Sequence, residues 1–115
     1  MDEPGEPVRL LFVCRQNRKR SATAERVFCK RRDLDVRSAG VGHDALVRVN
    51  ERMLDWADVV FVMEERHRQE LEQLFPGHAA LSRIISLEIP DEYAFLDPLL
   101  VELLKSRVER HLQKS

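Results

Sequence analysis

The stretch from Leu10 to Phe28 restricts the possible folds of this chain more than any other part of the sequence. An apolar, β-prone run ends at Cys14, a short loop leads to Arg20, and an amphipathic segment follows with Ser21 as the expected N-cap of a helix. In a strand, loop and helix of this kind, backbone N–H groups and the positive end of the helix dipole point into the loop. The loop is therefore predicted to hold an anion, and the thiolate of Cys14 is the first anion that it would stabilise.

Strand-like and helix-like patterns alternate along the rest of the chain. Strands are predicted over residues 8–13, 34–38, 59–63 and 81–87, and helices over residues 22–32, 50–56, 64–75 and from 98 onward. The last helix is expected to bury an apolar stripe made of Leu99, Leu100, Leu103, Leu104, Val108 and Leu112. The alternation predicts an α/β fold: a four-stranded parallel sheet flanked by helices on both faces, a flavodoxin-like three-layer sandwich. Ligands of such sheets bind at the carboxyl ends of the strands, where Cys14 lies.

Composition limits the classes of protein to which the chain can belong. It has 115 residues and a net charge of -1, so no global field favours a membrane or a nucleic acid. We expect a loose tail over residues 1–7 and a single domain over residues 8–115. The chain has only two cysteines, which favours a reducing compartment. It has no apolar run of membrane-spanning length, and no signal peptide is expected, so we expect a cytoplasmic protein. The sequence shows no cluster of Cys and His residues, so no metal is expected.

The loop after the first strand resembles that of a known family. Cys14, five residues, Arg20 and Ser21, with Asn17 at the centre, resemble the signature of the low-molecular-weight protein tyrosine phosphatases, and the resemblance continues through residues 22–25. It implies the phosphatase I-like form of the predicted sandwich and no cofactor. It also implies cysteine-dependent hydrolysis of phosphate monoesters, phosphotyrosine above all, through a phosphocysteine intermediate.

The residue types in the loop suit this chemistry. Cys14 is the expected in-line nucleophile, and the planar guanidinium of Arg20 is expected to bind the equatorial oxygens of the phosphoryl group. Asn tolerates a left-handed backbone, so Asn17 is also expected to hold the loop in shape. The predicted substrate-binding residues are Arg15, Gln16, Asn17, Arg18, Lys19, Ser21 and Tyr93.

A leaving oxygen needs a proton, and an aspartate of the loop over residues 88–97 is the candidate general acid. In the family this loop carries Asp-Pro-Tyr. Asp91-Glu92-Tyr93 resembles it, with glutamate in place of proline, so Asp91 is preferred. Tyr93 would then flank the mouth of the site or anchor the loop. Asp97-Pro98 is the alternative, although it also fits the N-cap of the last helix.

The loop departs from the family pattern in its charge. Lys19 stands where many members carry a second cysteine, Gln16 replaces a usual glycine and Ala22 a usual proline. The four loop cations exceed what a monoester requires, and they fit a more anionic nucleotide or RNA-terminal phosphate equally well. These cations are Arg15, Arg18, Lys19 and Arg20.

Two further classes of function share this kind of loop. A non-hydrolytic phosphate-binding or phosphocysteine-relay module needs no general acid, so Asp91 argues against it. Arsenate reduction is disfavoured because Cys29 is the only other thiol.

The expected partners are a phosphorylated protein or a small phosphomonoester, with phosphate as the product. A nucleic-acid partner is disfavoured, no membrane partner is expected, and the oligomeric state stays open.

Overall fold

The structure, a computed structural model, describes residues 6–113, so most of the expected tail over residues 1–7 lies outside the described part of the chain. Four strands form one parallel sheet in the order β2-β1-β3-β4. They are β1 (Val8–Cys14), β2 (Leu34–Gly40), β3 (Val59–Val62) and β4 (Ile84–Ser86). The predicted four-stranded parallel sheet is therefore confirmed. The order reverses between β1 and β3, which places the ligand-binding edge at the end of β1.

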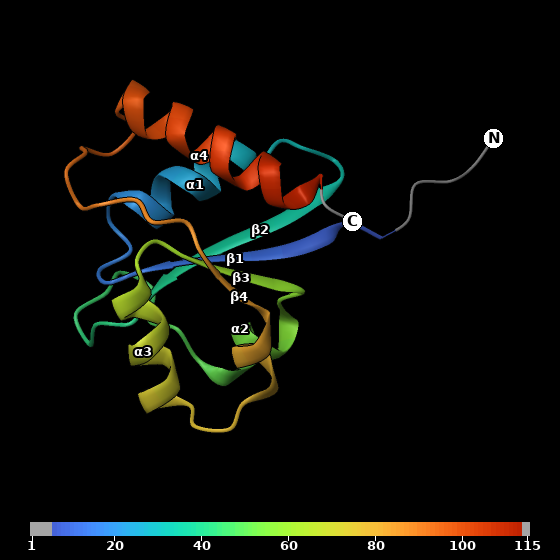
Figure 1. The fold of residues 1–115 in the computed structure, drawn as a ribbon, viewed down its shortest axis with the longest axis vertical. Helices are drawn as coiled ribbons and strands as arrows, with labels where there is room; N and C mark the ends of the chain where they lie inside the picture. Colours follow the sequence, from blue (N-terminus) through green and yellow to red (C-terminus); the bar gives the residue numbers. More distant parts are fainter. Residues whose placement is uncertain (1–5, 114–115) are drawn as a thin grey trace.

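Helices cover both faces of the sheet (Figure 1). The helices α1 (Arg20–Phe28) and α4 (Pro98–Leu112) lie on one face. The helices α2 (Glu51–Trp56) and α3 (Glu65–Leu74) lie on the other, together with a short 3-10 helix over Ala79–Arg83. The three-layer sandwich expected from the sequence is thus observed.

The alternation of side chains along β1 divides the core into two halves. Leu10, Phe12 and Cys14 point toward α1 and α4, whereas Leu11 and Val13 point toward α2 and α3. All five side chains are buried. Burial of each large apolar side chain contributes roughly 1.5–3 kcal/mol, so β1 is a rigid base for the loop that follows Cys14.

Aromatic rings reinforce the half of the core beneath α1. The ring of Phe12 stacks on Phe28 of α1 and on Phe61 of β3, with centroid separations of 5.8 and 5.4 Å. Offset stacking at these separations adds about 0.5–1.5 kcal/mol per pair beyond the buried area. The three rings fix the position of α1 relative to β1 and thereby the distance that the intervening loop must span.

The structure corrects the expected start of the first helix. We expected Ser21 as the N-cap, but α1 begins at Arg20 with Lys19 at the N-cap position, and no side chain caps it. Ser21 is the second residue of the helix and is fully buried. Its hydroxyl lies against the sulfur of Cys14 instead of capping the helix.

Two other expectations need correction. The fourth strand begins at Ile84 instead of residue 81, because residues 79–83 form the 3-10 helix, whose Ala80 N–H is held by the ring of His78. Leu99 is 67% exposed and does not belong to the buried stripe of α4. The buried positions of α4 recur every four residues from Leu100, and Leu99 lies about 100° around the helix from it.

Candidate active site

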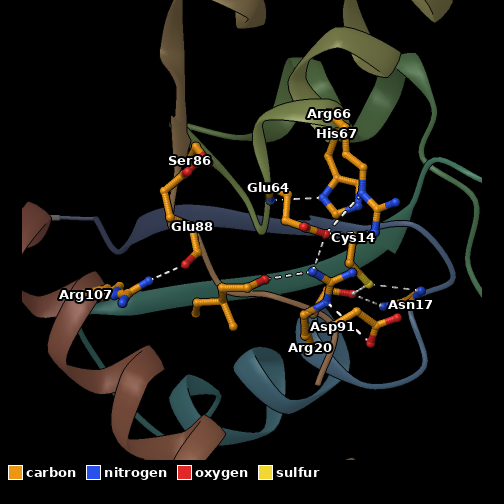
Figure 2. A network of polar contacts seen from close by, with 12 residues as sticks. Cys14, Asn17, Arg20, Glu64, Arg66, His67, Ser86, Glu88, Asp91 and Arg107 are labelled. Carbon is orange, nitrogen blue, oxygen red and sulfur yellow. Dashed lines mark hydrogen bonds and ion pairs between the residues drawn. The ribbon is translucent and has the colours of Figure 1, made fainter. Parts of the chain in front are cut away.

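Cys14 ends β1 and is almost completely buried at the carboxyl edge of the sheet. The backbone N–H of Asn17 donates to its sulfur at 3.2 Å, and the hydroxyl oxygen of Ser21 lies 3.0 Å from the same atom (Figure 2). The loop therefore surrounds the sulfur as the sequence predicted.

Asn17 holds the loop in its conformation. Its φ angle is 59°, in the left-handed region that asparagine tolerates better than most residues. Its side-chain amide donates to the hydroxyl oxygens of Ser21 at 2.8 Å and Ser38 at 2.9 Å, and Ser38 in turn donates to a carboxylate oxygen of Glu25. Asn17 thereby joins the loop to α1 and to β2, which agrees with the shape-holding role expected for it.

A second loop, over residues 41–49, supports the first from the side. The N–H groups of Val41 and Gly42 donate to the carbonyls of Cys14 and Arg15 at 3.0 and 2.8 Å. A Cβ atom added at Gly40 would lie 2.4 Å from the carbonyl oxygen of Arg15. Only glycine allows the two backbones to approach this closely, so Gly40 fixes the position of the loop after Cys14 relative to the sheet.

Arg20 lies beside Cys14 and is 3% exposed. Its Nη1 donates to Glu64 Oε1 at 2.7 Å and to the carbonyl oxygen of Ile89 at 2.8 Å, and its Nε lies 3.9 Å from Asp91 Oδ1. In Figure 2 Glu64 and Asp91 approach the guanidinium from different sides. A buried guanidinium needs such partners, and they also hold its plane in one orientation.

Glu64 and its neighbours on α3 are residues that the sequence analysis missed. Glu64 is the N-cap of α3 and also accepts from Arg66, so Arg20 and Arg66 share one carboxylate. Burial raises the pKa of the Glu64 carboxyl, but the hydrogen bonds and the positive charges of Arg20 and Arg66 together outweigh burial and lower it overall. A usable signal was present, because Glu64 follows the predicted central strand and therefore lies at the edge where ligands bind.

His67 completes this group from the interior. Its Nδ1 accepts from the backbone N–H of Glu64 at 3.1 Å, and the ring is fully buried. Burial first, and then the positive charge of Arg20, lower the pKa of His67 to about 4. The ring is therefore neutral at pH 7, with its proton on Nε2, an atom without a hydrogen-bond partner among the described residues.

A cavity of about 240 Å³, open to solvent on one side, lies at the loop. Its lining consists of Cys14, Arg15, Gln16, Arg18, Lys19, Arg20, Arg66 and Asp91. Seven of the ten predicted site residues thus line one cavity. Arg66 is the one lining residue that the sequence analysis did not single out.

The structure separates the two candidate aspartates. Asp91 lines the cavity, whereas the side chain of Asp97 accepts from the backbone N–H of Leu99 at 2.9 Å and caps α4. Three predicted substrate-binding residues lie elsewhere. Asn17 and Ser21 are buried within the loop, and half-buried Tyr93 lies in a shallow hollow beside α4, outside the cavity lining. Tyr93 therefore occupies the position of a loop anchor.

Cys29 cannot protect Cys14 in this conformation. It follows the C-terminal end of α1, whereas Cys14 lies at the N-terminal end, and both thiols are free. A helix of nine residues is about 13 Å long, well beyond the Cα separation of a disulfide.

Within residues 6–113 no three His, Cys, Asp or Glu side chains are grouped to hold a metal ion. None of the helices over the same residues is both long and apolar enough to cross a membrane.

Several solved phosphatases have the same architecture as this chain. The low-molecular-weight protein tyrosine phosphatase from T. tengcongensis is 23% identical, with a TM-score of 0.76 over 94% of this chain and 99% of that one. The chain has the low-molecular-weight phosphatase fold. The tyrosine phosphatase Wzb from Escherichia coli K30, solved with phosphate, is 24% identical, with a TM-score of 0.73 over 92% of this chain and 96% of that one.

The arginine phosphatase YwlE from Geobacillus stearothermophilus is also similar. It is 22% identical, with a TM-score of 0.73 over 93% of this chain and 94% of that one. No family model matches the sequence, and no curated protein is significantly similar to it. The likeness is therefore one of fold, shared with phosphatases that are named for two different phosphorylated residues.

Proposed function

We propose that this protein is a cysteine-dependent phosphatase that hydrolyses phosphate monoesters, with phosphotyrosine as the foremost candidate, through a phosphocysteine intermediate. The observation that carries the proposal is that the thiol of Cys14, the guanidinium of Arg20 and the carboxyl of Asp91 line one cavity. The fold shared with tyrosine phosphatases supports it. The substrate would be a phosphorylated protein or a small phosphomonoester, and phosphate would be the product.

In the first step the sulfur of Cys14 attacks phosphorus and the phosphorus–ester oxygen bond breaks. Asp91 gives its proton to the departing oxygen, so that an alcohol or phenol leaves instead of its anion. Loop N–H groups, the N-terminus of α1 and Arg20 stabilise the charge on the equatorial oxygens. Because Nη1 of Arg20 is already engaged, its Nε and Nη2 are the donors left for the phosphoryl group.

In the second step the sulfur–phosphorus bond breaks. Asp91, now a carboxylate, accepts a proton from a water molecule that attacks phosphorus. Phosphate is released, the thiolate of Cys14 is restored, and Asp91 is again protonated for the next substrate. A phosphocysteine-relay module would not need this second use of Asp91.

The YwlE neighbours raise protein arginine phosphatase as another activity of this fold. The lining of the cavity disfavours it here. Five of the eight lining residues are cationic, and they would repel the positively charged guanidinium that carries the phosphoryl group in such a substrate. Esters of alcohols and phenols leave no such charge in the site. A cytoplasmic location and a single domain over residues 8–115 remain part of this proposal.

Rapid-mixing hydrolysis of two aryl phosphates tests the proposal. Wild type should release a burst of 4-nitrophenol, and Cys14→Ser should release none. Asp91→Asn should slow release from phenyl phosphate by roughly 10²-fold or more, and release from 4-nitrophenyl phosphate much less, because the better leaving group needs little help from an acid. Asp97→Ala is the comparison, and it should retain the burst while losing about 1 kcal/mol of stability with its helix cap.

Three results would count against the mechanism. A stable phosphoenzyme without turnover would replace hydrolysis with a phosphocysteine relay. A burst that survives Cys14→Ser would exclude Cys14 as the nucleophile. Loss of phenyl phosphate hydrolysis in Asp97→Ala but not in Asp91→Asn would transfer the acid role to Asp97.

A further inference from the structure

The cations that line the cavity outnumber the carboxylates that lie near them. Five cations line it, and three of them have carboxylate partners on α3 or at its N-cap. These pairs are Arg15 with Glu70 at 3.2 Å, Arg20 with Glu64 at 2.7 Å and Arg66 with Glu64 at 2.8 Å. The two remaining cations are Arg18 and Lys19.

Arg18 and Lys19 differ from the other three in having no such partner. Among residues 6–113 neither side chain takes part in an ion pair or a hydrogen bond, and both are exposed at the cavity. Asp91, the one acidic residue of the lining, lies near Arg20. Two unbalanced positive charges therefore stand side by side at the N-terminal end of α1, where the helix dipole adds to their field.

The transferred phosphoryl group does not require these two side chains. Its oxygens can bind to the N-terminus of α1 and to Nε and Nη2 of Arg20, which donate no hydrogen bond within the described residues. Cys14 is likewise supported by Asn17 and Ser21. Neither the nucleophile nor the scissile phosphate therefore requires the hydrogen-bond donors of Arg18 and Lys19.

We propose that Arg18 and Lys19 form a second anion subsite, which selects monoesters that carry another negative group close to the scissile phosphate. This rests on the proposed function and narrows its substrate class. The lining has no aromatic or aliphatic residue on which a phenol ring could pack, so recognition there depends on charge and hydrogen bonds. Arg18 and Lys19 line the same cavity as Cys14, so the second group lies close to the scissile phosphate.

Two sources could supply this second negative group. One is a small molecule with a second phosphate, and the other is a phosphotyrosine peptide with an acidic residue beside the phosphotyrosine. Both present oxygens that the fork of Arg18 and the ammonium of Lys19 can bind.

Binding to the full chain with Cys14→Ser tests the subsite without dependence on turnover. Titration calorimetry would compare adenosine 3′,5′-bisphosphate with adenosine 5′-monophosphate, and a phosphotyrosine peptide flanked by glutamates with one flanked by alanines. We expect the more anionic member of at least one pair to bind about tenfold tighter, as one added charge-assisted contact would give. The pair that shows the advantage identifies the source.

The same titrations in two double variants locate the effect. Arg18→Gln with Lys19→Gln should reduce the tenfold ratio to less than about threefold, since the remaining contribution is diffuse attraction. Lys30→Gln with Lys105→Gln removes the same charge at exposed positions away from the cavity and should keep the ratio. In wild type, methylenediphosphonate should inhibit 4-nitrophenyl phosphate hydrolysis more strongly than methylphosphonate, which repeats the comparison without the Cys14 substitution.

The outcomes separate the subsite from the underlying activity. Equal affinities within both pairs, or a ratio that the Arg18 and Lys19 variant keeps, would overturn the subsite even if wild type hydrolyses aryl phosphates. A wild type without hydrolysis would overturn the proposed function, while the calorimetric ratios would still decide whether the subsite exists. If the Arg18 and Lys19 variant lost affinity equally for every ligand, these side chains would serve the scissile phosphate only, and the subsite would again be overturned.

Discussion

Replacing Glu64 should weaken catalysis although Glu64 does not line the cavity. Its carboxylate holds Nη1 of Arg20 at 2.7 Å, and Arg20 is 3% exposed. Without this partner the guanidinium keeps the carbonyl of Ile89 and the more distant Asp91, and can turn toward them. An arginine that has left its orientation no longer presents two donors to the phosphoryl oxygens.

The size of the effect follows from the geometry of the pair. Breaking a fully buried ion pair costs about 3–5 kcal/mol, and one hydrogen bond to a charged group contributes about 1.5–3 kcal/mol. The side chain of Glu64 is 29% exposed and Arg20 keeps a second acceptor, so the lower range applies. For Glu64→Ala we expect a loss of about 2 kcal/mol, which corresponds to roughly 30-fold in kcat/KM. Glu64→Gln keeps an oxygen acceptor and should lose roughly fivefold.

Steady-state hydrolysis of 4-nitrophenyl phosphate would measure the change in kcat/KM, and urea unfolding would measure the stability of each variant. The matched control is Glu65→Gln, which removes the same charge one residue along α3, where Glu65 pairs with Arg68 on the surface. It should keep kcat/KM within about twofold of wild type, as expected for an exposed pair. A Glu64→Ala variant that is as active as Glu65→Gln would refute the reasoning, as would a loss that disappears once the unfolded fraction is taken into account.

Two further predictions concern stability. The pKa of His67 is lowered from an ordinary 6.5 to about 4 in the folded protein. Between these pH values the ring of His67 is protonated in the unfolded chain but not in the folded one. The free energy of unfolding should therefore fall by up to about 3 kcal/mol as pH drops from 6.5 to 4. Urea unfolding at both ends of this range should show a smaller fall in His67→Gln, while His43→Gln, at an exposed position, should behave like wild type. Asn17→Ala should lower the free energy of unfolding by about 2–3 kcal/mol, because it removes two side-chain hydrogen bonds and places alanine in a left-handed backbone conformation. Asn17→Gly removes only the hydrogen bonds and should be about 1 kcal/mol more stable than the alanine variant. Equal unfolding free energies for the two Asn17 variants would show that the backbone conformation contributes nothing.

Much of the fold could be predicted from local patterns. The run before Cys14 is apolar at successive positions, as a strand buried on both faces must be, and β1 spans it. Asn50 and Asp97 were placed at helix starts, and both side chains accept from the first turn of α2 or α4. Such features depend on residues that are neighbours in sequence, so the sequence alone contains them.

Expectations failed where a distant partner changed a local preference. Ser21 has the residue type of an N-cap, yet the thiol of Cys14 and the amide of Asn17 hold its hydroxyl inside the loop. For Tyr93 the sequence left two positions open, the mouth of the site and a loop anchor, and its place beside α4, outside the cavity lining, favours the second. Propensity describes what a residue prefers when nothing else competes, and buried polar contacts compete strongly.

The sequence by itself determined the loop after β1, the thiol at its start and the arginine at its end, because strand, loop and helix follow one another closely in the chain. Only the tertiary structure decided which aspartate faces that loop and which acid orients its arginine. Asp91 and Glu64 reach Arg20 from different loops, 27 residues apart in the chain. Parallel strands bring their carboxyl ends to a common edge, and no pattern of neighbouring residues records which side chains meet there.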